Sequence, residues 1–161
     1  MPTIINIHGP MAAGKSTLTR LMRENFKTYA YVDRPNIKKG LDPLGKPISR
    51  ALSKDAVYFI VKQLMKQGDN IILEEINPES LKKKLRYYFK KYHYTLHSFY
   101  VHCSVEEAMK RDVQRSNKNR SERVKEIHAQ MKGPTSLDIF FDTEKMNIDE
   151  CMNLMMKKIQ K

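Results

Sequence analysis

The chain has 161 residues, of which 40% are hydrophobic, and it carries a formal net charge of +12. This length suits one domain spanning residues 1–161 and excludes two of ordinary size, and no apolar stretch approaches the roughly 18 residues of a membrane span. The excess of lysine and arginine predicts attraction to polyanions, with nucleic acid as the leading candidate, although lysines also serve as solvated helix faces.

The N-terminus and the cysteines indicate the compartment. The opening "MPTIIN" lacks the basic region, long apolar core and cleavage site of a signal peptide. Cys103 and Cys151 match no metal-binding spacing and form no disulfide framework. We therefore expect a reducing, cytoplasmic setting with no membrane segment, in which both cysteines are small core residues.

Strand and helix patterns alternate along the chain, which predicts a parallel sheet covered by helices on both faces. Residues 34–48 and 116–120 show neither period and are expected to be irregular. The expected strands are residues 3–8, 29–33, 70–74, 95–102 and 138–142. The expected helices are residues 15–26, 49–66, 79–92, 105–115 and 121–131, and a last one carrying Ile148, Met152, Met155 and Ile159.

The stretch "GPMAAGKST", residues 9–17, stands between the first strand and the first helix. This order of strand, G-x-x-x-x-G-K-S and helix is typical of a phosphate-binding loop, in which backbone N–H groups and the helix N-terminus face the phosphates. Lys15 would reach the β- and γ-phosphates, and the Ser16 hydroxyl would hold Mg²⁺. The expected phosphate-binding residues of the loop are Gly9, Ala12, Ala13, Gly14, Lys15, Ser16 and Thr17.

Arginines cluster after the fourth predicted strand. Arg111 and Arg115 are four positions apart in "SVEEAMKRDVQRSNKNRSER" and therefore lie on one side of a helix. Arginines that close over a transferring phosphate stabilise the charge that builds there. The alternative is a solvated basic helix, and the position after the strand favours the phosphate-binding interpretation.

The motifs of the chain, taken together, resemble those of the small P-loop kinases, in particular polynucleotide 5′-kinases, chloramphenicol phosphotransferases and zeta-toxin-like kinases. The similarity covers the phosphate-binding loop, "YVDR" at the second strand, "EEIN" at the end of the third, the R-x-x-x-R of Arg111 and Arg115 with a lid at about residues 116–122, and a final "DT" strand end. It implies a three-layer α/β fold with a five-stranded parallel sheet in the order 2-3-1-4-5. It also implies transfer of the γ-phosphoryl group of ATP, with Mg²⁺, to a hydroxyl or phosphate acceptor, and it matches Arg115 and Arg111 to the lid arginines.

The acceptor side departs from the pattern of these kinases. Matched to the polynucleotide kinases through Lys38, the position of the catalytic base falls on Pro35, which has no acidic side chain. Matched to the chloramphenicol phosphotransferases, it falls on Asp33, which we favour as the base. The alternative role of Asp33 is to satisfy backbone N–H groups at the strand end.

The third strand also departs from the resemblance, because Glu74 and Glu75 stand where an aspartate is expected. Side chains alternate along a strand, so only one of the two is expected to face the site. Glu74 is our candidate for a second, water-bridged ligand of Mg²⁺.

Basic residues are slightly enriched where the acceptor would bind, and Arg34, Lys38 and Arg50 are the candidate acceptor-binding residues. This favours an anionic acceptor, a nucleotide or a nucleic-acid 5′ end. Two alternatives stay open: a kinase of a small non-nucleotide metabolite or antibiotic, and a non-catalytic nucleotide-binding protein.

Overall fold

The computed structural model describes residues 1–41, 50–116 and 120–160. Five strands form one sheet in the order β2-β3-β1-β4-β5, and every neighbouring pair is parallel, as the sequence predicted. The strands are β1 (Thr3–His8), β2 (Ala30–Asp33), β3 (Ile71–Glu74), β4 (Thr95–His102) and β5 (Asp138–Asp142). The helices are α1 (Lys15–Asn25), α2 (Arg34–Leu41), α3 (Arg50–Gln67), α4 (Pro78–Lys84), α5 (Arg86–Lys91), α6 (Val105–Ser116), α7 (Ser121–Gln130) and α8 (Ile148–Ile159).

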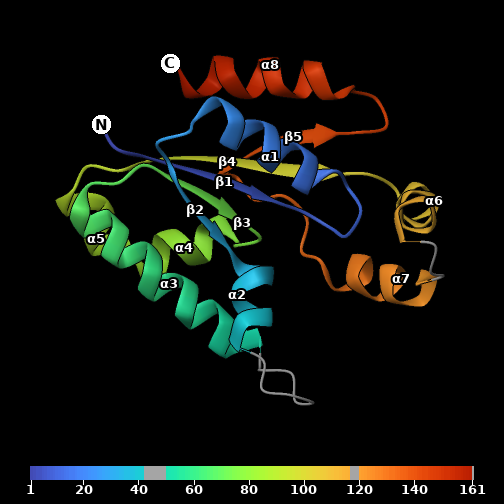
Figure 1. Ribbon diagram of the computed structural model, residues 1–161, viewed down its shortest axis with the longest axis horizontal. Helices are drawn as coiled ribbons and strands as arrows, with labels where there is room; N and C mark the ends of the chain where they lie inside the picture. Colours follow the sequence, from blue (N-terminus) through green and yellow to red (C-terminus); the bar gives the residue numbers. More distant parts are fainter. Residues whose placement is uncertain (42–49, 117–119, 161) are drawn as a thin grey trace.

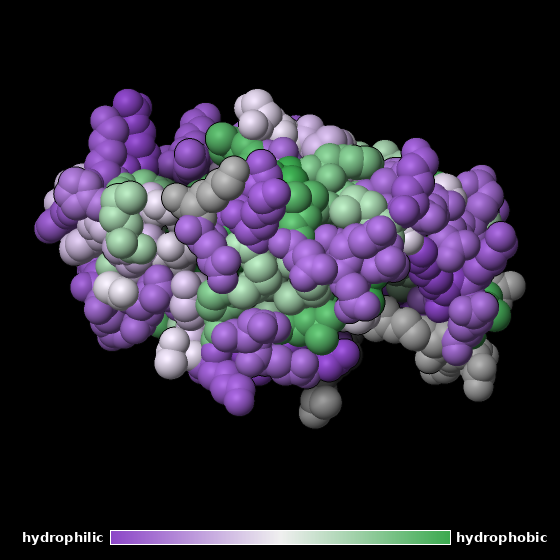
Figure 2. Space-filling view, turned by 90° about the horizontal axis from the view of Figure 1, so that it is seen from above, coloured by the Kyte–Doolittle hydropathy of each residue, from purple (hydrophilic) through white to green (hydrophobic). Residues whose placement is uncertain are grey.

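Helices cover both faces of this sheet (Figure 1). Helices α1 and α8 lie on one face, where Met22 and Met155 join the core against Ile5 and Ile7 of β1. Helices α3, α4 and α5 lie on the other face, where the core includes Ile4. Residues on both sides of β1 are fully buried because a central parallel strand is covered twice. Seen from above, hydrophilic residues dominate the surface and apolar ones lie between them (Figure 2).

The strand register brings the ends of β1, β2 and β3 together at the carboxyl edge of the sheet. Asp33 of β2 and Ile7 of β1 both stand opposite Glu74 of β3. In parallel α/β sheets this edge is where ligands bind, because the strands end there and loops leave for the helices. The residues that follow β1, β2 and β3 are therefore neighbours in space.

Two predicted segments differ from the structure. Residues 34–41 form α2, whereas we expected residues 34–48 to be irregular, and residues 42–49 lie outside the described part. The helix begins there because the Asp33 carboxylate accepts the Asn36 N–H at 3.0 Å, and Pro35 suits a first turn whose N–H groups have no helical partner. The single helix expected at residues 79–92 is two helices, α4 and α5, which meet at Leu85, where the backbone leaves helical geometry (φ −109°, ψ 19°).

Candidate active site

The phosphate-binding loop, residues 9–17, leaves β1 and enters α1. Gly9 has φ 143°, and a Cβ atom there would lie 2.0 Å from the Val101 carbonyl oxygen, so the close approach to β4 requires glycine. Gly14 has φ 100° and precedes the first residue of α1, while Ala12 is left-handed at φ 61°. These left-handed residues curl the backbone into the compact turn that the sequence predicted.

Side chains hold several carbonyl oxygens of this loop, and a run of its N–H groups faces inward. Within the described part of the chain, no protein atom accepts a hydrogen bond from the N–H groups of Ala12 to Ser16. Such unpaired N–H groups beside a helix N-terminus form an anion cradle. The carbonyl contacts are Lys15 Nζ with Pro10 O at 2.6 Å, His128 Nε2 with Met11 O at 3.0 Å, Cys103 Sγ with Ala12 O at 3.9 Å and Thr143 Oγ1 with Ala13 O at 3.0 Å.

Lys15 points into the site and is 6% exposed. Its ammonium lies 3.6 Å from Glu75 Oε1, and Glu75 Oε2 accepts a hydrogen bond of 3.0 Å from Arg34. Arg34 also donates to the Glu75 carbonyl oxygen at 3.2 Å. Glu75 therefore holds both cations and links the loop to the start of α2.

Ser16 begins a second polar chain, which leads to Asp33 through two intermediate side chains. Ser16 Oγ donates to Glu74 Oε1 at 3.4 Å, and the Tyr31 hydroxyl lies 2.9 Å from Glu74 Oε2 and 3.0 Å from Asp33 Oδ2. The single Tyr31 proton serves one of these two carboxylates at a time. Burial raises the pKa of Glu74, and burial together with the two carboxylates raises the pKa of Tyr31.

The expectation that only one of the two glutamates would face the site is wrong. Glu74 is the last residue of β3, and Glu75 has φ 65° in the left-handed region, so strand alternation ends between them. Both carboxylates therefore lie at the loop, where Glu74 meets Ser16 and Glu75 meets Lys15. Glu74 is 5% exposed, whereas the Glu75 side chain is 27% exposed.

Asp33 lies at the carboxyl edge as expected, and it also performs the alternative role considered for it. Its Oδ1 accepts the Asn36 N–H, and its Oδ2 accepts the Asn36 side-chain amide at 2.7 Å. Asp33 thus caps α2 while it remains half-exposed beside Glu74. Capping and a role toward an acceptor are compatible, because a carboxylate has about four lone-pair sites.

The other acceptor-side candidates, Arg34, Lys38 and Arg50, have different surroundings in the structure. The Arg34 guanidinium is already paired with Glu75. Lys38 lies on α2, one helical turn from Arg34, and makes no ion pair with a described residue. Arg50 begins α3, and its side chain lies outside the described residues.

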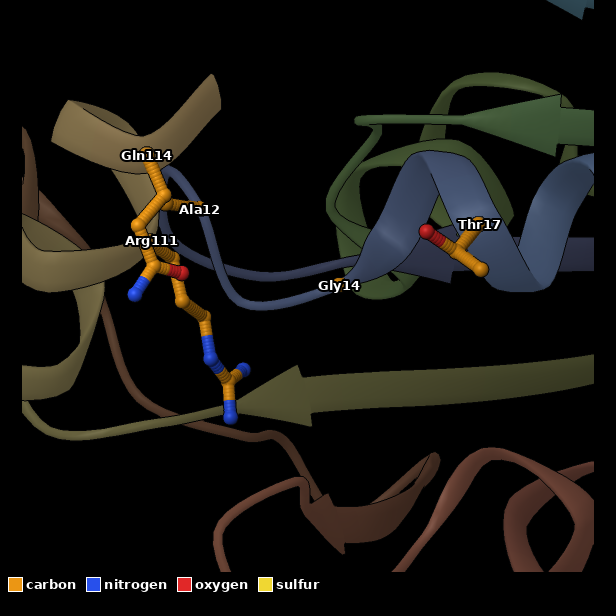
Figure 3. A pocket seen from close by; sticks show the side chains of 5 residues that line it. All are labelled: Ala12, Gly14, Thr17, Arg111 and Gln114. Atoms are coloured by element: carbon orange, nitrogen blue, oxygen red, sulfur yellow. The ribbon is translucent and has the colours of Figure 1, made fainter.

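On the opposite side of the loop, α6 closes a hollow of about 290 Å³. Figure 3 shows Arg111 and Gln114 reaching it from α6, with Ala12, Gly14 and Thr17 on the loop side. Arg111 is bonded to Glu107 at 2.8 Å, to Thr143 Oγ1 at 2.8 Å and to the Thr143 carbonyl oxygen at 3.0 Å. It therefore ties α6 to the segment that supports the loop.

The lid proposed for residues 116–122 is described only in part. Ser116 ends α6 and Ser121 begins α7, while residues 117–119 and the Arg115 side chain lie outside the described residues. Arg120 pairs with the buried Asp112. The two helices on either side of the lid are thus joined by an ion pair.

A buried polar chain fixes the end of β1, just before the loop. His8 Nε2 lies 2.7 Å from Asp138 Oδ1, and Ser98 Oγ donates to the same oxygen at 2.6 Å. The second oxygen of Asp138 accepts from the Thr135 N–H at 2.8 Å and from its hydroxyl at 2.9 Å. Burial alone raises the pKa of Asp138, but the hydrogen bonds from His8, Ser98 and Thr135 outweigh it and lower the pKa to about 2.

Sequence reasoning missed four residues of the site: Glu75, Tyr31, His128 and Thr143 have no assigned role there until the chain is folded. The signal for Glu75 was present in "LEEIN", since the residue after a strand need not keep the alternation. No sequence signal pointed to His128.

Known proteins resemble this chain in family and in fold. A family model described as an AAA domain matches residues 4–135. No curated protein matches the chain. Along the described part of the structure, no helix has the length and apolar character needed to cross a membrane.

Solved structures, among them two of kinases, share the fold. A gluconokinase from Sinorhizobium meliloti 1021 is similar over 99% of this chain and 92% of its own, with 14% identity and a TM-score of 0.70. The APS kinase of Mycobacterium tuberculosis, solved with AMPPNP and APS, is similar over 99% and 98%, with 16% identity and a TM-score of 0.70. A tunicamycin resistance protein from Deinococcus radiodurans is similar over 99% and 96%, with 13% identity and a TM-score of 0.67.

Proposed function

We propose that this chain, which belongs to the AAA-domain family whose model it matches, is an ATP-dependent kinase. It moves the γ-phosphoryl group of ATP to a hydroxyl or phosphate acceptor. One observation carries the proposal: the five successive backbone N–H groups of Ala12 to Ser16, which have no acceptor among the described residues, stand beside the Lys15 ammonium and the Ser16 hydroxyl at the carboxyl edge of the sheet. The kinase folds of the gluconokinase and the APS kinase support it.

On the nucleotide side, the loop N–H groups donate hydrogen bonds to the phosphate oxygens, and Lys15 exchanges Pro10 O for the β- and γ-phosphates. The hollow beside α6 receives the part of ATP that leaves the loop on that side. Arg115 is our candidate for the lid arginine that meets the charge developing on the transferred group. Arg111 acts through Thr143, to which it is bonded.

The residues present fit Mg²⁺, which arrives with ATP. Ser16 Oγ and Glu74 Oε1 are hard oxygen donors 3.4 Å apart, and Mg²⁺ prefers oxygen ligands from a few side chains, phosphates and water. When bound, Mg²⁺ neutralises charge on the phosphates. The part of this chain is to hold it through Ser16 and Glu74 beside the loop.

On the acceptor side, Asp33 is the proposed base. It takes the proton from the acceptor hydroxyl, the acceptor oxygen forms its bond to the γ-phosphorus, and the bond from that phosphorus to the bridging oxygen of ADP breaks. The position of Asp33 supports this, since it stands opposite Glu74 in the sheet register and next to α2. Arg34, Lys38 and Arg50 are the proposed acceptor-binding residues.

The acceptor we favour is a nucleotide or a nucleic-acid 5′ end, because the candidate segment is basic and the whole chain carries +12. One observation favours the second candidate, a small non-nucleotide metabolite. A hollow of about 460 Å³ between α2 and α3 is lined by apolar residues and glycine. Its lining residues are Ile37, Gly40, Leu41, Ala56, Phe59 and Ile60.

A transfer assay separates these functions. The protein is incubated with γ-labelled ATP and a panel of 5′-hydroxyl oligonucleotides, nucleotides, nucleosides, sugars and small alcohols, with Lys15→Ala as the blank. Label on a nucleotide or oligonucleotide supports the favoured acceptor. Label only on neutral small molecules replaces it with the second candidate. ATP binding without transfer to any acceptor overturns the kinase proposal and leaves a nucleotide-binding protein.

A further inference from the structure

A strongly basic surface lies away from the candidate active site, on α4 and α5. Six cations stand within ten positions and all six are exposed, while Glu79 is the one acidic residue between positions 78 and 94. We call these six residues the α4–α5 basic surface: Lys82, Lys83, Lys84, Arg86, Lys90 and Lys91.

These cations lack the partners that other surface cations of the chain have. Arg20, Lys125 and Lys145 each pair with a carboxylate three or four positions away. None of the six residues of the α4–α5 basic surface forms an ion pair with any residue in the described ranges. Unneutralised like charges on adjacent helical turns repel one another, so the arrangement costs stability that a bound polyanion would restore.

Aromatic rings lie among these cations. Tyr87 is 62% exposed, and the Lys91 ammonium lies 5.5 Å from the centre of its ring and 5.4 Å from the centre of the Tyr92 ring. Tyr88 stacks on Tyr92 with ring centres 6.3 Å apart and meets Tyr87 edge-on at 5.2 Å. Helix α4 is packed against the sheet, because its apolar side, including Leu81, is buried there.

We propose that the α4–α5 basic surface binds single-stranded nucleic acid, with its cations on the phosphates and a base stacked on Tyr87. Exposed aromatic rings among lysines are what a flexible strand with unstacked bases can use. A protein partner is disfavoured, since lysine is depleted from the cores of protein interfaces and Tyr87 is the one large hydrophobic residue exposed on the described surface of α4 and α5. A membrane surface is disfavoured because no apolar face accompanies the charge.

The α5 end of this surface lies at the opposite edge of the sheet from the phosphate-binding loop, and α4 leads to it from the segment that follows β3. The loop follows the carboxyl end of β1, whereas α5 ends four positions before β4 begins, at the amino edge. In Figure 1, α5 and α6 accordingly lie at opposite ends of the molecule. The eight residues of β4 span about 25 Å, so the α5 end of the surface is well separated from the phosphate-binding loop.

The test measures how tightly the protein binds a labelled oligothymidylate of 20 nucleotides, by fluorescence anisotropy over a series of salt concentrations. The triple variant Lys82→Gln, Lys83→Gln, Lys84→Gln is compared with Lys27→Gln, Lys157→Gln, Lys158→Gln. The control removes the same charge from exposed lysines on the α1–α8 side of the sheet. Circular dichroism and thermal unfolding confirm that both variants are folded.

We expect the α4 variant to bind about tenfold or more weakly and to reduce the slope of log affinity against log salt by about 2, because single strands contribute about 0.7 per phosphate neutralised. The control should stay within about threefold of the parent protein. Equal weakening of both variants would mean that net charge alone attracts the strand, and it overturns the proposal. No effect in either variant overturns it as well.

A second variant tests the stacking. Tyr87→Leu keeps an apolar side chain and removes the ring, so it should weaken oligothymidylate binding about fivefold or more, while Tyr87→Phe should bind like the parent. Duplex DNA should bind more weakly than the single strand and ignore Tyr87→Leu. Tight binding to vesicles containing phosphatidylserine, with no binding to the oligonucleotide, would assign this surface to membranes and overturn the proposal.

Discussion

Ser16 on α1 and Glu74 at the end of β3 are 58 positions apart in the sequence, and their side-chain oxygens lie 3.4 Å apart. Glu74 is buried, and its partners are a serine and a tyrosine hydroxyl. A buried carboxylate that forms no ion pair with a described residue is unfavourable for folding and available for binding a cation. Replacing the Glu74 carboxylate should therefore affect the stability of the fold and the use of Mg²⁺ in opposite directions.

Glu74→Gln should raise the temperature of unfolding and lower the capacity to use Mg²⁺. Burial raises the pKa of Glu74, so the folded state disfavours its charge, and stability falls as the pH rises through that raised pKa. The neutral amide removes this cost while it can still bond Ser16 and Tyr31. We expect half-maximal activity to need about tenfold or more Mg²⁺. Calorimetry and Mg²⁺ titration check both parts, and a less stable variant with unchanged Mg²⁺ dependence would contradict them.

Lys15→Ala should abolish productive use of ATP and leave the fold intact. The Lys15 ammonium is the charge aimed at the phosphates, and Glu75 keeps Arg34 as its partner when the lysine is removed. We expect kcat/KM to fall about 10²-fold or more. Lys27→Ala, which removes an exposed lysine beyond α1, is the matched control and should keep full activity. Unimpaired turnover in a folded Lys15→Ala protein would refute the assignment of the loop.

Asp33→Asn should remove most phosphoryl transfer and leave ATP affinity nearly unchanged. Asparagine caps helices as well as aspartate does, so α2 should keep its N-terminus while the base is lost. We expect kcat to fall about 10²-fold or more, measured alongside ATP binding by titration calorimetry. Asn36→Ala removes a partner of Asp33 but keeps the carboxylate, and it should stay active. Normal turnover in Asp33→Asn would assign the base elsewhere.

Arg111→Ala should impair stability and ATP binding, whereas Arg115→Ala should impair turnover. The Arg111 guanidinium is bonded to Glu107 and Thr143, so its loss should lower stability by about 1 kcal/mol and weaken ATP binding through the loop. Arg115→Ala should lower kcat far more than ATP affinity, since a lid arginine acts on charge that develops during transfer. Separate measurement of kcat and of the Kd for ATP distinguishes them. Reduced affinity with normal kcat in Arg115→Ala would make it a ground-state contact.

Asp138→Asn should destabilise the protein at neutral pH and lose its effect in acid. Hydrogen bonds outweigh burial and lower the pKa of Asp138 to about 2, below its ordinary value of 3.8. The carboxylate therefore stabilises the fold above about pH 4, and this contribution disappears as the pH falls toward 2. The contribution of this carboxylate to the free energy of unfolding is about 2 kcal/mol, because the side chain is fully buried. Urea unfolding of both proteins from pH 7 to pH 2 should show converging stabilities, and a constant difference would contradict the account.

The loop and the parallel sheet were accessible from the sequence because they depend on local patterns, whereas the strand order came from the resemblance to small P-loop kinases. The glycines and Lys15 follow an apolar strand at fixed spacing, and the alternation of strand and helix periods specifies a parallel sheet with buried faces. Helix α2 was missed because its start depends on a capping bond that the Asn36 N–H donates to the Asp33 carboxylate, which a sequence rich in proline and lysine does not display.

The tertiary structure decided which side chains meet at the site. Parallel register places Asp33, Ile7 and Glu74 side by side at one edge of the sheet, and no local period encodes contacts between residues 40 or more positions apart. The left-handed backbone at Glu75 turns a second carboxylate toward Lys15, which strand alternation cannot predict. Thr143 and His128 reach the loop carbonyls only after β5 and α7 have packed. The sequence by itself thus determined the phosphate-binding loop and the sheet, and packing determined how the carboxylates and supporting side chains surround that loop.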